Sequence, residues 1–196
     1  MAERVDPPPT SWAKRLISEL DTADQRAKEL AAGLTPRQLN WKPSQNAWSV
    51  GQCLEHLCVF NEVYLPAITA SLTDRPLDAV QDIKLGWFGR WFIRNYIEPS
   101  PASKRARAPK KIAPGTRADP HVLDLFLTSN QAARELVRRA SDYDVNRIRF
   151  KDPLIPVLRF TVGTALEIVP IHQRRHLLQA ERVKQAADFP GRESDS

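Results

Sequence analysis

Two histidines four residues apart, His172 and His176, are the clearest candidates for chemistry in the sequence. On a helix, residues at this spacing lie one turn apart on the same face, so both imidazole rings can address one point. One divalent metal ion would suit that point, but a zinc site with an open coordination position needs a third protein ligand. We take His56 as the third ligand, because it lies on another segment with an inward-facing helical pattern. Apolar residues at helical spacing around the pair predict that its face is buried: Ala165, Ile168, Val169, Val183 and Ala187.

Other interpretations of these histidines are weaker. A single histidine on an apolar face is more often a hydrogen-bonded core residue than a metal ligand. The segment from His172 to His176 lacks the glutamate of the H-E-x-x-H motif, which disfavours a zincin-type protease. The two E-x-x-H repeats of a ferritin-like di-iron site are also absent. His121 has no matching partner, and we expect it at the surface.

Three polar residues are candidates for supporting a metal site without binding the ion. Gln179 lies one turn beyond the histidine pair on the same face, where it would orient a ligand or a water molecule. Gln52 precedes His56 by one turn, although a helix-capping role already explains it. Asn130 interrupts an apolar face, and we expect it either to face the cavity or to hydrogen-bond another helix. Cys53 is expected to be a small buried thiol.

The charged residues near the predicted ligands offer no clear general base. Glu55 and Glu167 are expected to lie off the ligand face, which favours thiol transfer slightly over hydrolysis. Arg174 and Arg175 are expected to point away from the histidines, towards solvent or a dimer interface.

Four long helices are predicted from apolar residues at helical spacing, over about 10–32, 49–72, 119–140 and 164–187. Start signals accompany three of them. Ser49 with Gln52 and Thr164 with Glu167 have the spacing of capping boxes, and Asp119 precedes a first-turn proline. Almost no alternating pattern accompanies these helices. The fold class is therefore predicted to be all-α, a four-helix bundle.

Residues 73–118 form an unusually long connection between the second and third helices, which normally signals function or disorder. An aromatic stretch over 85–97 predicts a short helix lying on the bundle, and the rest of the connection is expected to be extended. A connection of this length can run the length of the bundle, so the helices it joins can be parallel in an up-down-down-up order. Residues 142–161 are expected to be a second loop. Trp41 and Trp48 are expected to close one end of the bundle.

Length and composition predict a single domain over residues 1–196, with disordered tails over about 1–9 and 190–196. No apolar run approaches the roughly 18 residues of a membrane span, and the N-terminus lacks the features of a signal peptide. We therefore expect a cytoplasmic protein without a membrane partner. The two cysteines are five apart on one predicted helix and indicate no oxidising compartment.

The formal net charge of +6 comes from one segment between Ser100 and Arg117, which holds six basic residues and no acidic ones. Such a segment could contact phosphates, but no recognition element accompanies it, so nucleic acid is not expected as a partner. Attraction of an anionic small-molecule substrate, or of a thiol cofactor, fits the charge better.

Two stretches of the chain resemble the signatures of the DinB-like (YfiT-like) metalloprotein superfamily: Trp48-Ser49-x-Gly51-Gln52-x-Leu54-x-His56-Leu57 and His172-x-Arg174-Arg175-His176-Leu177-x-Gln179. The likeness runs from the first helix to the last and includes the aromatic, basic and proline-rich insertion. It implies a four-helix bundle of up-down-down-up topology, often a homodimer. It also implies one divalent metal ion, usually zinc or nickel, bound by His56, His172 and His176.

The members of this superfamily include thiol-dependent S-transferases and isomerases and proposed hydrolases. The leading functional hypothesis is therefore an enzyme, a metal-dependent thiol S-transferase or hydrolase that uses a low-molecular-weight thiol or water. A metal with an open position can lower the pKa of water to about 7 or bind a thiol as thiolate. The alternative is a non-catalytic stress-response or binding module in which the metal stabilises the bundle.

Overall fold

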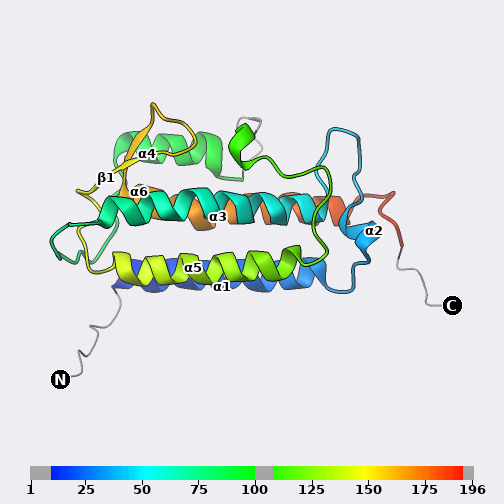
Figure 1. Ribbon diagram of the computed structural model, residues 1–196, viewed down its shortest axis with the longest axis horizontal. Helices are drawn as coiled ribbons and strands as arrows, with labels where there is room; N and C mark the ends of the chain where they lie inside the picture. The colour runs from blue at the N-terminus through cyan, green and yellow to red at the C-terminus, as the bar shows by residue number, and fades with distance from the viewer. Residues whose placement is uncertain (1–9, 100–107, 192–196) are drawn as a thin grey trace, which may run out of the picture.

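A computed structural model gives the fold, and it describes residues 10–99 and 108–191. The predicted tail at 1–9, residues 192–196 of the other tail, and residues 100–107 of the basic segment lie outside the described residues. The four long helices are α1 (Ser11–Ala31), α3 (Val50–Leu72), α5 (Val122–Ala140) and α6 (Val162–Lys184). Figure 1 shows α1 and α6 running in one direction and α3 and α5 in the other. The predicted up-down-down-up bundle is confirmed.

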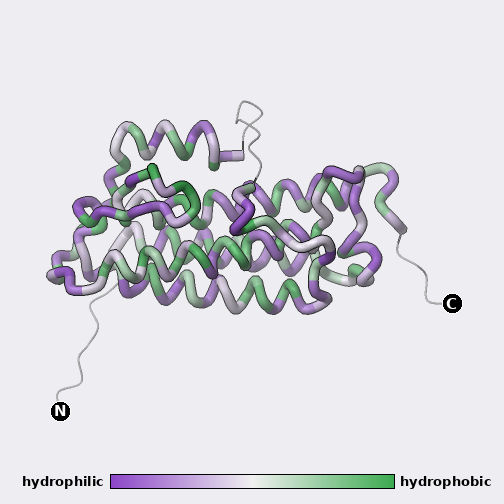
Figure 2. Tube along the Cα trace, turned by 45° about the horizontal axis from the view of Figure 1, so that its top comes forward, coloured by the Kyte–Doolittle hydropathy of each residue, from purple (hydrophilic) through white to green (hydrophobic). Residues whose placement is uncertain are grey.

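Each helix of the bundle packs against two others. Both α1 and α3 pack against α5 and α6, so α1 and α3 face each other across the diagonal. Hydrophobic and hydrophilic residues alternate along every helix (Figure 2), as expected for helices with one buried face. The parallel neighbours α3 and α5 are the two helices that the long connection joins. None of the described helices is long and apolar enough to cross a membrane.

The hydrophobic core consists of two clusters, one towards each end of the bundle. On α1, the first cluster ends at Leu20 and the second begins at Ala23. The same division falls between Leu177 and Val169 on α6. The residues between the clusters include buried polar side chains from all four helices: Asp24, His56, Asn61, Asn130, His172, Gln173 and His176. A polar layer therefore crosses the middle of the bundle.

Capping residues fix where the helices begin. Ser49 and Gln52 form the predicted capping box at α3. The expected capping box at Thr164 is wrong. Helix α6 begins at Val162 because the Oγ1 of Thr161 accepts a hydrogen bond of 3.2 Å from the Thr164 amide.

The third long helix, in contrast, begins later than predicted. Helix α5 starts at Val122, because Asp119 and Pro120 form a turn before it. The carboxylate of Asp119 accepts a hydrogen bond from the His121 amide within that turn. His121 is exposed, as expected.

Short helices lie in the connections between the long helices. The long connection between α3 and α5 contains three short helical elements: α4 (Trp87–Phe92), a π-helical turn η1 (Ile93–Ile97) and a 3-10 helix η2 (Lys110–Ile112). The short helix predicted over 85–97 is thus confirmed. The C-terminal part of the long connection packs tightly on α3, where a Cβ at Gly51 would lie 2.7 Å from that of Ala118. Helix α2 (Pro36–Leu39) lies earlier, between α1 and α3.

The expectation of a plain loop over 142–161 is wrong. Strands β1 (Arg149–Lys151) and β2 (Arg159–Thr161) form an antiparallel hairpin there, with Phe150 opposite Phe160. Both phenylalanines are buried. Each strand has only three residues, too few for an alternating pattern to stand out in the sequence.

Candidate metal centre

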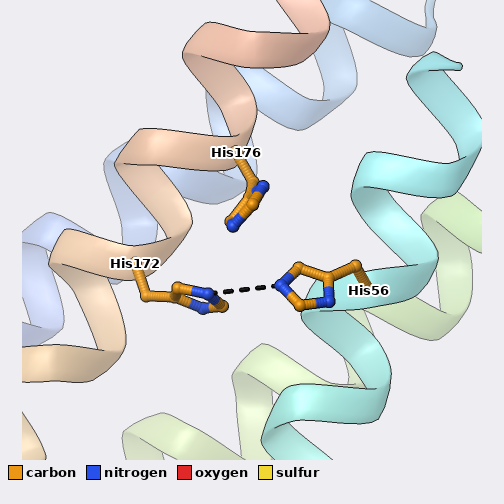
Figure 3. Close-up of side chains that lie close together, drawn as sticks. All are labelled: His56, His172 and His176. Atoms are coloured by element: carbon orange, nitrogen blue, oxygen red, sulfur yellow. Dashed lines mark hydrogen bonds between the residues drawn. The ribbon is translucent and has the colours of Figure 1, made fainter. Parts of the chain in front are cut away.

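Three histidines from two helices lie together in the polar layer. His56 comes from α3, and His172 and His176 come from successive turns of α6 (Figure 3). Each offers a ring nitrogen within 4.8 Å of those of the other two. The side chains are 1 %, 8 % and 9 % exposed, respectively. We call His56, His172 and His176 the histidine cluster.

Hydrogen bonds set the orientation of His56. Its Nδ1 donates to the backbone carbonyl of Ile112 in η2, at 2.6 Å. The neutral ring therefore carries its lone pair on Nε2, which lies 3.3 Å from Nε2 of His172. Two nitrogens bound to one tetrahedral zinc at 2.0–2.1 Å would be about 3.4 Å apart. The spacing of these two rings thus suits a shared metal ion.

The predicted supporting residue Gln179 contacts His176. The Oε1 of Gln179 accepts a hydrogen bond from Nδ1 of His176, at 3.0 Å. This contact leaves the lone pair on Nε2, and in Figure 3 one nitrogen of His176 points towards the space between the other two rings. A ligand histidine usually donates its second nitrogen to an acceptor in this way. Nδ1 of His172 is buried and has no hydrogen-bond partner among the described residues.

Burial keeps the three imidazoles neutral at pH 7. It lowers the pKa of His172 well below its usual range, and the nearby cationic forms of His176 and His56 and the charge of Arg175 lower it further. Burial, followed by the charge of His56, lowers the pKa of His176 to about 3. The pKa of His56 is also lowered by burial, although its bond to Ile112 opposes the shift. Neutral imidazole is the form that binds metal ions.

Two aromatic side chains pack against the histidine cluster. The indole of Trp48 lies 4.8 Å from the ring of His56 and 5.5 Å from that of His176, measured between ring centroids. The ring of Phe60 lies 4.2 Å from that of His172. We expected Trp48 to close the end of the bundle, but it packs on the histidines instead. These contacts restrict the rings to a narrow range of orientations.

The expectation that Arg175 faces solvent or a dimer interface is wrong. Arg174 is exposed, but Arg175 is half-buried and donates to the Tyr96 carbonyl of η1 at 2.8 Å. Burial lowers the pKa of the Arg175 guanidinium, which remains charged at pH 7. Its positive charge contributes to the low pKa values of His172 and His176. The cluster therefore lies in a positive electrostatic environment.

Carboxylates and thiols do not join the histidine cluster within the described part of the chain. Glu55 accepts a hydrogen bond from the Gly115 amide, and Glu167 pairs with Arg15 of α1. Cys53 is fully buried, and burial raises the pKa of its thiol to about 12. The expectations for Glu55, Glu167 and Cys53 thus agree with the structure.

Gln52 holds the long connection against α3. Besides capping the helix, its Nε2 donates to the Gly115 carbonyl at 2.5 Å. Gly115 lies three residues after Ile112, the acceptor for His56. Gln52 therefore acts on the histidines only through the position of this loop.

Asn130 hydrogen-bonds other helices, one of the two roles expected for it. Its Nδ2 donates to Asp24 of α1 at 2.7 Å, and its Oδ1 accepts from Gln173 of α6 at 2.6 Å. Asp24 also accepts from Arg134, and Asn61 of α3 lies 3.4 Å from Asn130. We call Asp24, Asn61, Asn130, Arg134 and Gln173 the amide network. It joins all four helices directly beside the histidine cluster.

The sequence could not point to every contributor to this site. Ile112 acts through its backbone carbonyl, which every residue type carries, so no pattern marks it. Gln173 faces the core, with a histidine before it and two arginines after it in the sequence. Its partner Asn130 lies on α5, diagonally across the bundle, so only the tertiary structure brings the two together. The proximity of Trp48 to the histidines depends on the loop before α3.

The donor set fits one divalent metal ion. Two of the imidazoles have Nδ1 engaged by oxygen acceptors, and a ring nitrogen of each of the three converges on a common space. Imidazole ligands suit zinc, nickel, copper and iron, so the residues alone do not select among these metals. That the cluster holds a metal ion stays a prediction.

Comparisons with known proteins agree with the fold. The family model described as the DinB superfamily matches residues 19–180. No curated protein matches the chain. Among solved structures, the chain is similar to YfiT from Bacillus subtilis, described as a probable metal-dependent hydrolase with an unusual four-helix bundle topology. The match has a TM-score of 0.58 and 18% sequence identity, and it covers 93% of this chain and 91% of that one.

Proposed function

This chain belongs to the DinB superfamily, and from that premise we propose that it is a metal-dependent enzyme acting on a small molecule, a thiol S-transferase or a hydrolase. His56, His172 and His176 would hold one divalent metal ion, with zinc or nickel as the leading candidates. The single observation that carries the proposal is the convergence of three buried, neutral imidazoles from α3 and α6. A bound metal would supply Lewis acidity towards water or a thiol.

The residues around the cluster have separate roles in this proposal. The carbonyl of Ile112 and the amide oxygen of Gln179 fix the rings of His56 and His176. Trp48 and Phe60 pack on the rings and exclude water from that side. None of these four groups is placed to exchange a proton with substrate, so we assign them positioning roles.

The electrostatics of the site favour an anionic ligand. Three neutral imidazoles leave the charge of a divalent ion uncompensated, and no carboxylate of the described residues joins the cluster. The half-buried guanidinium of Arg175 adds to this positive potential. An anionic substrate, or a thiol that binds as thiolate, would offset the charge.

Different observations support the two reaction classes. The description of YfiT as a probable metal-dependent hydrolase favours hydrolysis. The cluster itself, in the described part of the chain, lacks the carboxylate that would act as a general base for water. Thiol transfer needs no such base once the thiol is ionised, so we place it first.

A non-catalytic stress-response or binding module is the alternative. The near-complete burial of the histidines favours this alternative, since a structural metal needs no access for substrate. In that case removing the metal would lower the unfolding temperature, and the loaded protein would turn over no substrate. A cytoplasmic location and a homodimer remain part of our proposal.

The test compares metal-loaded protein, metal-depleted protein and the His172→Ala variant. Each is assayed with a panel of low-molecular-weight thiols and a reactive electrophile, and with a panel of esters and amides. Thiol consumption that requires both metal and His172 would support the transferase. Metal-dependent ester or amide cleavage would support the hydrolase, and inactivity in both panels with a raised unfolding temperature on metal binding would support the alternative.

A further inference from the structure

Helix α4 and the β1–β2 hairpin form a layer outside the four-helix bundle (Figure 1). They contact each other through aromatic rings: Phe88 and Phe92 of α4 lie 5.7 Å and 5.1 Å from Phe160 of β2. The inner side of this layer belongs to the first core cluster, through the buried Phe92, Phe150 and Phe160, and the bundle does not cover its outer side. The layer therefore presents a surface that the metal centre does not explain.

That surface exposes large apolar side chains. Trp87 is 74% exposed and Val157, in the loop between the strands, is 83% exposed. Phe88, Trp91 and Ile155 are exposed as well. Large apolar residues exposed close together in two neighbouring elements usually mark an interaction site. We call Trp87, Phe88, Trp91, Ile155 and Val157 the apolar rim.

The exposed charged side chains of α4, η1 and the hairpin are cationic, and Asp82 and Glu98 lie just outside α4 and η1. Arg90 and Arg94 are exposed on α4 and η1, and no acidic residue occurs from Lys84 to Ile97. The hairpin adds further exposed cations: Arg149, Lys151 and Arg159. Its one acidic residue, Asp152, is buried and accepts hydrogen bonds from the amides of Leu154 and Ile155. The local excess of positive charge therefore favours an anionic occupant.

We propose that the apolar rim and its cations bind the surface of an anionic lipid membrane. Tryptophan and phenylalanine beside arginine is the composition of segments that lie in the membrane interface. A second copy of the chain would bring like charges together, which disfavours it as the occupant. The expectation of no membrane partner came from the absence of a spanning segment, and a peripheral contact needs none.

Vesicle co-sedimentation of the full chain tests this proposal. Wild type is expected to sediment with vesicles that contain phosphatidylserine and not with pure phosphatidylcholine vesicles. The Trp87→Ser/Val157→Ser variant should bind about tenfold more weakly, because it loses the apolar insertion. Arg90→Gln/Arg94→Gln should weaken binding by about tenfold or more, and salt should weaken wild-type binding.

The matched control is Leu125→Ser, which removes a 52% exposed leucine from α5 on the other side of the bundle. It should bind vesicles like wild type, and circular dichroism should show all variants folded. Absent binding to anionic vesicles, equal binding to neutral ones, or an equal loss in Leu125→Ser would each overturn the proposal. So would a wild-type dimer that Trp87→Ser/Val157→Ser converts to monomer without any vesicle binding, since the rim would then join two copies.

Discussion

The histidine cluster and the amide network lie side by side in the polar layer, but their polar atoms are satisfied in different ways. In the network, Asn130 and Gln173 exchange hydrogen bonds with each other, and Asp24 receives bonds from both Asn130 and Arg134. In the cluster, protein groups engage only the outer nitrogens of His56 and His176, and the inner nitrogens face one another. Apart from Oδ1 of Asn61, which has no partner among the described residues, the network is bonded internally and stabilises the fold. The converging lone pairs of the cluster form an arrangement that a cation would satisfy.

The largest effect is expected in metal binding when a cluster histidine is removed. His172→Ala should weaken metal affinity by more than about 100-fold, because the loss of a mere supporting residue already costs about 10–100-fold. Competition with a chelator measures this affinity. The metal-free variant should stay folded, as judged by circular dichroism. Retention of wild-type affinity would show that the cluster is an ordinary part of the core.

A substitution in the amide network is expected to lower the stability of the fold and to leave metal binding unchanged. Asn130→Leu leaves Oδ1 of Asp24 and the side-chain amide of Gln173 without a partner, although Arg134 still donates to Oδ2 of Asp24. Each unsatisfied group costs about 1–3 kcal/mol. We expect the free energy of unfolding in urea to fall by about 3 kcal/mol, with metal stoichiometry unchanged. The control Thr128→Leu alters an exposed residue of the same helix and should cost less than about 0.5 kcal/mol. If Asn130→Leu also abolishes metal binding, the histidine cluster and the amide network depend on each other.

The pH dependence of stability should report the cluster. His172 and His176 have pKa values lowered by burial, the latter to about 3, whereas both regain ordinary values near 6.5 on unfolding. Between these values the unfolded chain binds more protons, so stability falls as pH falls. The metal-free protein should lose about 1 kcal/mol per histidine from pH 6.5 to 5.5.

The variant His176→Gln serves as the control for this pH dependence. It removes one titrating group, so urea unfolding at both pH values should show a smaller loss than in wild type. An identical loss in the variant would mean that carboxylates elsewhere determine the slope.

The smallest effect is expected for the residue that orients His176. Gln179→Leu removes the acceptor for Nδ1 and should weaken metal affinity by about tenfold, with little change in the stability of the metal-free protein. Gln179→Glu keeps an acceptor and should restore affinity. Equal losses in the two variants would mean that Gln179 contributes by packing and not through its hydrogen bond.

The sequence predicted what depends on local patterns of side chains. The apolar stripe of α6 placed His172 and His176 inside the bundle, and Ser49 with Gln52 correctly marked the start of α3. It failed where tertiary contacts decide between similar signals. Thr161 and Thr164 are both good caps, and strand β2, which ends at Thr161, determines that the helix begins there.

The sequence also failed to predict contacts that a backbone carbonyl makes, and it failed to predict which side of a helix a neighbouring element covers. The carbonyl of Ile112 reaches His56 only because Gln52 and Glu55 hold the loop at Gly115. Arg175 appeared to face solvent because the sequence did not show that η1 would cover that side of α6. Both features come from the long connection, whose path no helical periodicity specifies.

Anomalous diffraction from crystals of the full chain grown with zinc or nickel tests the central claim most directly. Data collected on both sides of the absorption edge should give one peak within bonding distance of a nitrogen of each of His56, His172 and His176, at an occupancy that elemental analysis supports. Absence of a peak among the three imidazoles, or a peak elsewhere on the chain, would contradict the assignment of this cluster as a metal centre.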